Sequence, residues 1–201
     1  MEELFLKAYL WINGVTPPDE YYNMLHEIFM RPENENNQIL LELEDCTNSK
    51  TDTFHTFHMV FYNTDIWNEE HFLKLFLEYL QQQYKENSSV NKTIELGCWL
   101  SSGLPLSDKT RLKQPISTLD YLAEFIDDGF MSLYSIYDQF FDCIYFYSNV
   151  TEKESAFKAA LQRDNIHTQK STLEKKIKTS NEVEQTKKTS LFSRLFKKKS
   201  L

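Results

Sequence analysis

Four aspartates in the C-terminal half of the chain have the residue type and the spacing to do chemistry. Asp127 and Asp128 are adjacent, and Asp138 and Asp142 are four residues apart, which is about one helical turn. Paired carboxylates can serve as a general acid and base, or can bind a cation. The same pattern is typical of a solvated helix face, and this simpler interpretation is the one we favour over catalysis.

These aspartates could also attract a basic protein partner. No Lys or Arg occurs between Gln114 and Glu152, so the sequence places no neutralising charge within this stretch. A surface of one sign speeds association with a partner of opposite sign and disfavours wrong partners. The predicted partner-binding residues are Asp127, Asp128, Asp138 and Asp142.

His55 and His58 are the other residues whose spacing suggests a site. On a helix they would share a face and could bind a metal ion. We predict a strand here, and residues three apart on a strand point to opposite sides. We therefore expect half-buried structural histidines and no metal.

Motifs for nucleophilic or phosphate chemistry are absent. Cys98 lies in an apolar segment, where a cysteine is usually a small buried hydrophobic residue. Ser101 precedes Ser102 and Gly103 but lacks the G-x-S-x-G pattern of a nucleophile elbow. The chain has 4 glycines and neither glycine-rich phosphate motif. We expect no cofactor and no enzymatic activity.

Positive charge is concentrated at the C-terminus. Residues 161–201 hold 11 Lys and Arg and 4 Asp and Glu, whereas residues 1–160 hold 11 and 26. We predict an acidic globular domain over 1–163 and a polar, basic tail over 164–201, with a short amphipathic segment at 190–200. The tail could lie on an anionic membrane, fold back on the acidic body, or bind nucleic acid. Nucleic acid is the weakest of these, because the acidic body would repel phosphate. The predicted membrane-contact residues are Leu191, Phe192, Arg194, Leu195, Phe196, Lys197, Lys198 and Lys199.

Two helices should position the four aspartates. Ser117 and Asp120 have the spacing of a capping box, and Gly129 suits a C-terminal cap. From Phe130 to Ile144, apolar residues recur at intervals of three and four opposite a polar stripe that holds two of the aspartates.

The remaining segments predict a mixed fold. Further helices are expected at residues 2–12, from Thr16 to Arg31, from Thr64 or Asp65 onward, and from Thr151 to about Arg163. Strands are expected at Gln38–Asp45, Phe54–Tyr62 and Thr93–Leu100, because these segments alternate or are rich in β-branched and aromatic residues. The predicted class is α+β: about five helices packed on a small, mainly antiparallel sheet, followed by a mobile basic tail.

Composition limits the class of protein further. The chain has 201 residues and a net charge of −8, and its three cysteines, Cys46, Cys98 and Cys143, form no C-x-x-C pair. No signal peptide and no membrane-spanning run are expected, so we predict a cytoplasmic location.

Three hypotheses for function follow. The first is a non-catalytic interaction module that binds a basic partner, for example an immunity-type protein that neutralises a toxin. The second is a peripheral adaptor held at the inner face of the membrane by its basic C-terminus. The third is an enzyme of unrecognised type, which would need a pocket lined by Asp138, Asp142, a histidine and the 101–115 loop.

Overall fold

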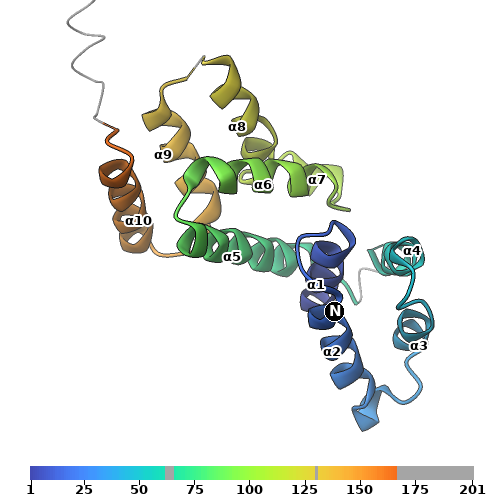
Figure 1. The fold of residues 1–201 in the computed structure, drawn as a ribbon. Helices are drawn as coiled ribbons and strands as arrows, with labels where there is room; N and C mark the ends of the chain where they lie inside the picture. Colours follow the sequence, from blue (N-terminus) through green and yellow to red (C-terminus); the bar gives the residue numbers. More distant parts are fainter. Residues whose placement is uncertain (62–65, 130, 167–201) are drawn as a thin grey trace, which may run out of the picture.

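The computed structural model describes residues 1–61, 66–129 and 131–166, and throughout these ranges the regular structure is helical (Figure 1). The elements are α1 (Glu2–Ile12), α2 (Pro18–Phe29), a 3-10 turn η1 (Pro32–Asn34), α3 (Gln38–Asp45), α4 (Lys50–Phe61), α5 (Glu69–Asn87), α6 (Val90–Ser102), α7 (Asp108–Arg111), α8 (Ile116–Asp128), α9 (Leu133–Ile144) and α10 (Val150–Arg163).

The predicted α+β class, with its antiparallel sheet, is wrong, because no strand occurs in the described ranges. The first predicted strand is α3. The Asn37 side chain caps this helix by accepting a hydrogen bond of 3.2 Å from the backbone N–H of Leu40. Leu40 and Leu43 are buried, and their separation of three residues puts both on one helix face.

The other two predicted strands are also helical, for a similar reason. In α4 the buried residues are Thr53, Phe57 and Val60, which follow each other at separations of four and three. In α6 they include Thr93, Gly97 and Leu100, again at four and three. This spacing is the period of a helix, and tertiary packing overrides the strand propensity of the individual residues.

The apolar helix α1 lies at the centre of the N-terminal half. Seven of its eleven residues are buried: Leu4, Phe5, Leu6, Ala8, Tyr9, Leu10 and Trp11. A helix that is apolar on most sides must be covered on most sides, and α1 packs against α2, α4 and α5. The Phe5 ring, fully buried, contacts the rings of Phe57, Phe61, Trp67 and Phe72, with centroids 4.5–5.6 Å apart.

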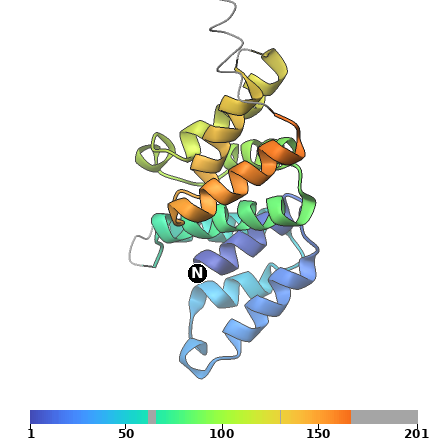
Figure 2. The ribbon, with the colours of Figure 1, turned by 90° about the vertical axis from the view of Figure 1, so that its left-hand side faces the viewer.

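The longest helix, α5, joins the two halves of the molecule. Its N-terminal part packs on α1, and it also packs on α6 and α9. Figure 1 shows α5 crossing the middle of the fold, with α1–α4 on one side and α6–α10 on the other. Figure 2 shows the same order from the side, with α9 and α10 above α5 and with α2 and α3 below it.

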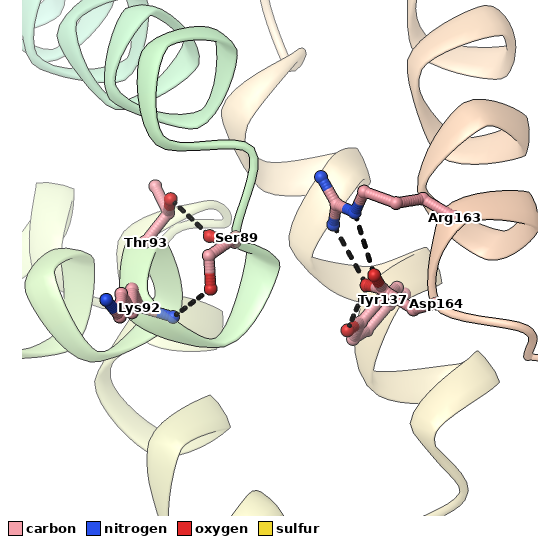
Figure 3. Close-up of polar contacts among 6 residues, drawn as sticks. All are labelled: Ser89, Lys92, Thr93, Tyr137, Arg163 and Asp164. Carbon is pink, nitrogen blue, oxygen red and sulfur yellow. Dashed lines mark hydrogen bonds and ion pairs between the residues drawn. The ribbon is translucent and has the colours of Figure 1, made fainter.

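The C-terminal half is a bundle built on α6, α8, α9 and α10. α6 packs on α8, α8 on α9, and α9 on α10. Ser89 caps the start of α6: its hydroxyl accepts a hydrogen bond from the Lys92 backbone N–H, and its carbonyl accepts one of 2.8 Å from the Thr93 hydroxyl (Figure 3). Gly97 lets α6 come close to its neighbours, because a Cβ there would lie 3.2 Å from a methyl carbon of Leu80 on α5.

Candidate interaction surface

The structure places the predicted partner-binding aspartates on two consecutive helices. Asp127 and Asp128 form the last turn of α8, and Asp128 is exposed. Gly129 ends the helix in the left-handed conformation, with φ of 65°, as predicted for a C-terminal cap. On α9, Asp142 is exposed and Asp138 is half-buried. Two of the aspartates therefore lie at the end of α8 and two lie one turn apart on α9.

A lysine from the next helix lies beside the two α9 aspartates. The Lys153 ammonium of α10 forms a hydrogen-bonded ion pair with the Asp142 carboxylate. This hydrogen bond raises the pKa of Lys153, and Asp138 adds to the effect. The Asp142 side chain is still 55% exposed, so the pair leaves it open to a further ligand. The stretch without Lys or Arg in the sequence thus gains one cation through folding.

A shallow groove opens next to Asp142. It lies between the start of α8 and the second half of α9, and its volume is about 30 Å³. Its lining residues are Gln114, Pro115, Thr118, Gln139, Asp142, Cys143 and Phe146. Small-molecule sites are about ten to thirty times larger, at roughly 300–1,000 Å³. The groove can accept the end of one side chain but not a metabolite.

Phe146 gives the groove an apolar edge. Its ring is 48% exposed and meets the Tyr147 ring edge-on at 5.0 Å. Cys143 also lines the groove, and burial raises the pKa of its thiol to about 12, so this cysteine stays protonated and is a poor nucleophile. The groove is therefore suited to contact with an apolar group beside a carboxylate.

Buried hydrogen bonds from α5 fix the end of α9 that forms the groove. The Gln81 side-chain amide donates to the Ile144 carbonyl and, at 3.1 Å, to the Ser148 hydroxyl. Both acceptors flank the segment that holds Phe146. The last carbonyls of a helix have no hydrogen-bond donor within the helix. Gln81 supplies such a donor to the carbonyl of Ile144, the last residue of α9.

A second pocket has no lining residue on α9. It has a volume of about 280 Å³ and lies between α4, the start of α5 and the segment before α7. Its lining residues are His58, Phe61, Glu69, Leu104, Pro105, Leu106, Ser107 and Arg111. It includes a histidine and part of the 101–115 loop, but neither Asp138 nor Asp142. This pocket therefore does not contain the combination of residues that our enzyme hypothesis requires.

Two charged residues of this second pocket, Glu69 and Arg111, form hydrogen bonds with other residues of the chain. Glu69 accepts hydrogen bonds from the Ser107 backbone N–H at 2.9 Å, from the Ser107 hydroxyl at 2.8 Å and from the Thr110 hydroxyl. Burial raises the pKa of Glu69, but these hydrogen bonds outweigh it and lower the pKa overall. Arg111 donates to the Leu104 carbonyl. An ionised carboxylate that holds the start of α7 is poorly placed to act as a general base.

The two paired histidines lie on a helix, not on the predicted strand. His55 is exposed, and His58 is half-buried with its ring 6.2 Å from the rings of Phe54 and Phe61. The argument that they point to opposite sides is therefore wrong. Across residues 1–61, 66–129 and 131–166, no three His, Cys, Asp or Glu side chains are grouped so that they could hold a metal ion.

Sequence reasoning overlooked a second acidic region. Residues 17–49 contain eight Asp and Glu and a single cation, Arg31. They form α2, η1 and α3, at the far end of the molecule from α9 and α10 (Figure 2). Counting charges in this window would have found it. Exposed Glu27, Glu33 and Glu35 of this region provide a charge-matched comparison for the α9 aspartates.

The predicted membrane-contact residues, 191–199, lie outside the described residues. Within the described part, no helix combines the length and the apolar character needed to cross a membrane. Comparisons of the chain with models of protein families, with curated proteins and with solved structures found no match. Function must therefore be argued from the residues and their geometry.

Proposed function

We propose that this chain is a non-catalytic interaction module that binds a basic protein through the exposed side of α9. One observation carries the proposal: the Asp142 carboxylate binds an ammonium group at the surface, beside a groove with an exposed aromatic edge at Phe146. Protein interfaces commonly combine an apolar centre with charged groups at its rim. A lysine or arginine of a partner could take the position of Lys153 while an apolar neighbour enters the groove.

The size and the polar contacts of the two pockets favour a role in binding a protein over a role as an enzyme. The groove beside Asp142 is too small for a metabolite, and the carboxylate of the larger pocket is used to hold α7. The Cys143 thiol is protonated, and the pKa of Cys98 is also raised by burial. A role as an immunity-type protein is one form of this proposal, in which the basic partner is a toxin acting in the cytoplasm.

The test is capture of partners by three forms of the full-length chain. The first is the unchanged chain, and the second has Asp128→Lys, Asp138→Lys and Asp142→Lys. The third is the control, with Glu27→Lys, Glu33→Lys and Glu35→Lys in the other acidic region. Both variants change the net charge equally, so nonspecific attraction of cations falls equally in both.

We expect one basic protein, identified by mass spectrometry, to be recovered with the unchanged chain and the control and to be lost with the aspartate variant. Circular dichroism should show the same helix content for all three forms. Equal recovery of the same proteins by the unchanged chain and the aspartate variant would contradict the proposal.

A further inference from the structure

The groove beside Asp142 combines two features that a ligand must match. It has an apolar edge at Phe146, and its carboxylate lies one helical turn from a second one at Asp138. A matching ligand needs one apolar side chain to enter the groove and cations within a few ångströms of it. A short amphipathic basic peptide has this chemistry.

The chain itself contains such a peptide. Residues 191–199 read LFSRLFKKK, with four apolar residues, one arginine and three consecutive lysines. The remainder of the chain is strongly acidic, with 26 Asp and Glu against 11 Lys and Arg in residues 1–160. Charge complementarity within one chain therefore favours contact between this segment and the α9 aspartates.

The described chain ends close to this surface. The Asp164 carboxylate, just after α10, accepts a hydrogen bond of 2.8 Å from Tyr137 on α9, so the exit point lies against the first half of α9 (Figure 3). From Tyr137 to Cys143 is six residues, or about 9 Å along the helix. The 24 residues from 167 to 190 can span at most about 80 Å. The segment 167–190 is therefore long enough for residues 191–199 to reach the groove.

We propose that residues 191–199 of the chain dock on the groove beside Asp142 and compete there with the basic partner. An apolar side chain of the segment enters the groove, and its lysines approach Asp138 and Asp142 in place of Lys153. This inference rests on the proposed function, because competition requires a partner that uses the same surface. It adds a regulatory element, since only a partner that displaces the segment gains access.

Because residues 191–199 belong to the same chain as the groove, even a weak affinity for the groove gives substantial occupancy. A tethered segment has an effective concentration on the order of 1 mM, so an affinity of about 1 mM as a free peptide fills half of the grooves. At half occupancy the apparent affinity for the partner is about twofold lower than that of the open groove. Removing the docking chemistry should therefore tighten partner binding by about twofold.

The test compares amide resonances in the NMR spectra of the full-length chain and three variants. One variant removes apolar groups (Phe192→Ser and Phe196→Ser), and one reverses cations (Lys197→Glu, Lys198→Glu and Lys199→Glu). The third is a control with Lys175→Glu, Lys176→Glu and Lys178→Glu, which changes the net charge equally outside the docking segment. All resonances are recorded at two protein concentrations, each with and without vesicles of phosphatidylserine.

We expect both docking variants to shift the resonances of Thr118, Gln139, Asp142 and Phe146, while the control leaves them in place. Resonances of α2 and α3 should not move. Unchanged groove resonances in both docking variants would overturn the inference. So would shifts that grow with protein concentration, which indicate the segment of a second copy, or shifts that need vesicles of phosphatidylserine, which indicate a membrane ligand.

The partner-capture experiment separates this inference from the proposed function. If the groove resonances do not respond to the docking variants but the aspartate variant still loses the partner, only the docking inference fails. If the resonances respond while the aspartate variant captures the same proteins, the proposed function fails and self-docking stands alone.

Discussion

The Tyr137 hydroxyl donates a hydrogen bond of 2.8 Å to the Asp164 carboxylate and so attaches the end of α10 to α9. Arg163 binds the same carboxylate through its Nε at 2.7 Å (Figure 3). The Arg163 guanidinium also lies 5.6 Å from the centre of the Tyr84 ring on α5. α5, α9 and α10 therefore meet at one ion pair, Arg163 with Asp164. This junction sets the direction in which the chain leaves α10 and holds α10 with Lys153 against the α9 aspartates.

The junction should make stability depend on pH. Hydrogen bonds from Arg163 and then from Tyr137 favour the ionised Asp164 carboxylate and lower its pKa from the ordinary 3.8. A lowered pKa in the folded state stabilises the fold above the ordinary pKa, and this stabilisation is lost as the pH falls through the folded value. The difference in unfolding free energy between the unchanged chain and Asp164→Asn should be constant above about pH 5 and shrink below about pH 4.

Urea denaturation at several pH values measures this difference. Tyr137→Phe serves as the comparison, since it removes one donor and keeps the Arg163 contact. Its effect should be the smaller of the two and should also shrink in acid. A difference that persists or grows below pH 3 would show that the Asp164 carboxylate is not stabilised in its ionised form.

The aromatic cluster around Phe5 should dominate the stability of the N-terminal half. Phe5→Ala removes a fully buried ring and leaves a cavity among five aromatic neighbours, which should lower the unfolding free energy by about 3–5 kcal/mol. Phe146→Ala is the matched control, because its ring is 48% exposed and its removal should cost less than about 0.5 kcal/mol. Thermal and urea unfolding measure both, and similar losses for the two would contradict the placement of Phe5.

A side chain at Gly103 should destabilise the fold, because Gly103 lies against Tyr9 of α1. A Cβ at Gly103 would lie 2.5 Å from the Tyr9 hydroxyl oxygen, which donates a buried hydrogen bond of 2.8 Å to the Leu100 carbonyl. Gly103→Ala should therefore displace that hydroxyl and cost about 1–3 kcal/mol of unfolding free energy.

A double-mutant cycle tests this explanation. In the Tyr9→Phe background the hydroxyl is already gone, so Gly103→Ala should cost at least about 1 kcal/mol less than in the unchanged chain. If the two substitutions add independently, the cost of Gly103→Ala has another origin and the predicted contact is wrong.

Helix patterns in the sequence were reliable where apolar spacing was long and clear. The helices at residues 2–12 and before Arg163 were predicted with close limits, as was the cap at Gly129. Segments that alternate, or that are rich in β-branched and aromatic residues, were not, and they include α4 and α6, which are longer than α1. α3 has eight residues, and its alternating Leu and Glu fit either a strand or a helix until Leu40 and Leu43 are seen to share one buried face. Their neighbours in α2 and α4, which a single sequence does not identify, decide between the two.

Hydrogen-bonding roles were harder to predict than helix positions. The capping box expected at Ser117 does not form, since α8 begins without a side-chain cap. Asp120 instead accepts a hydrogen bond of 2.7 Å from the Ser101 hydroxyl of α6. The groove likewise depends on Gln81, which lies more than sixty residues from Ile144 in the chain. Such long-range pairs leave no local signal.

The charge of the candidate surface also depends on a contact that the sequence does not reveal. The sequence shows a stretch without cations from Gln114 to Glu152, and the fold then brings Lys153 onto Asp142. Lys153 is the next residue after that stretch, yet its contact depends on how α10 turns back along α9. The intramolecular ion pair makes the proposed function open to a simple test, because it occupies the carboxylate that a partner would use.

The most direct measurement is the affinity of the captured basic partner for chains altered at this ion pair. Lys153→Ala frees Asp142 and should tighten binding by about two- to fivefold, the range expected from an exposed ion pair. Asp138→Lys with Asp142→Lys should weaken binding at least about tenfold, because like charges then face each other. Glu27→Lys with Glu33→Lys is the control and should change the affinity by less than about twofold. An affinity that is the same for all four chains would contradict binding through α9.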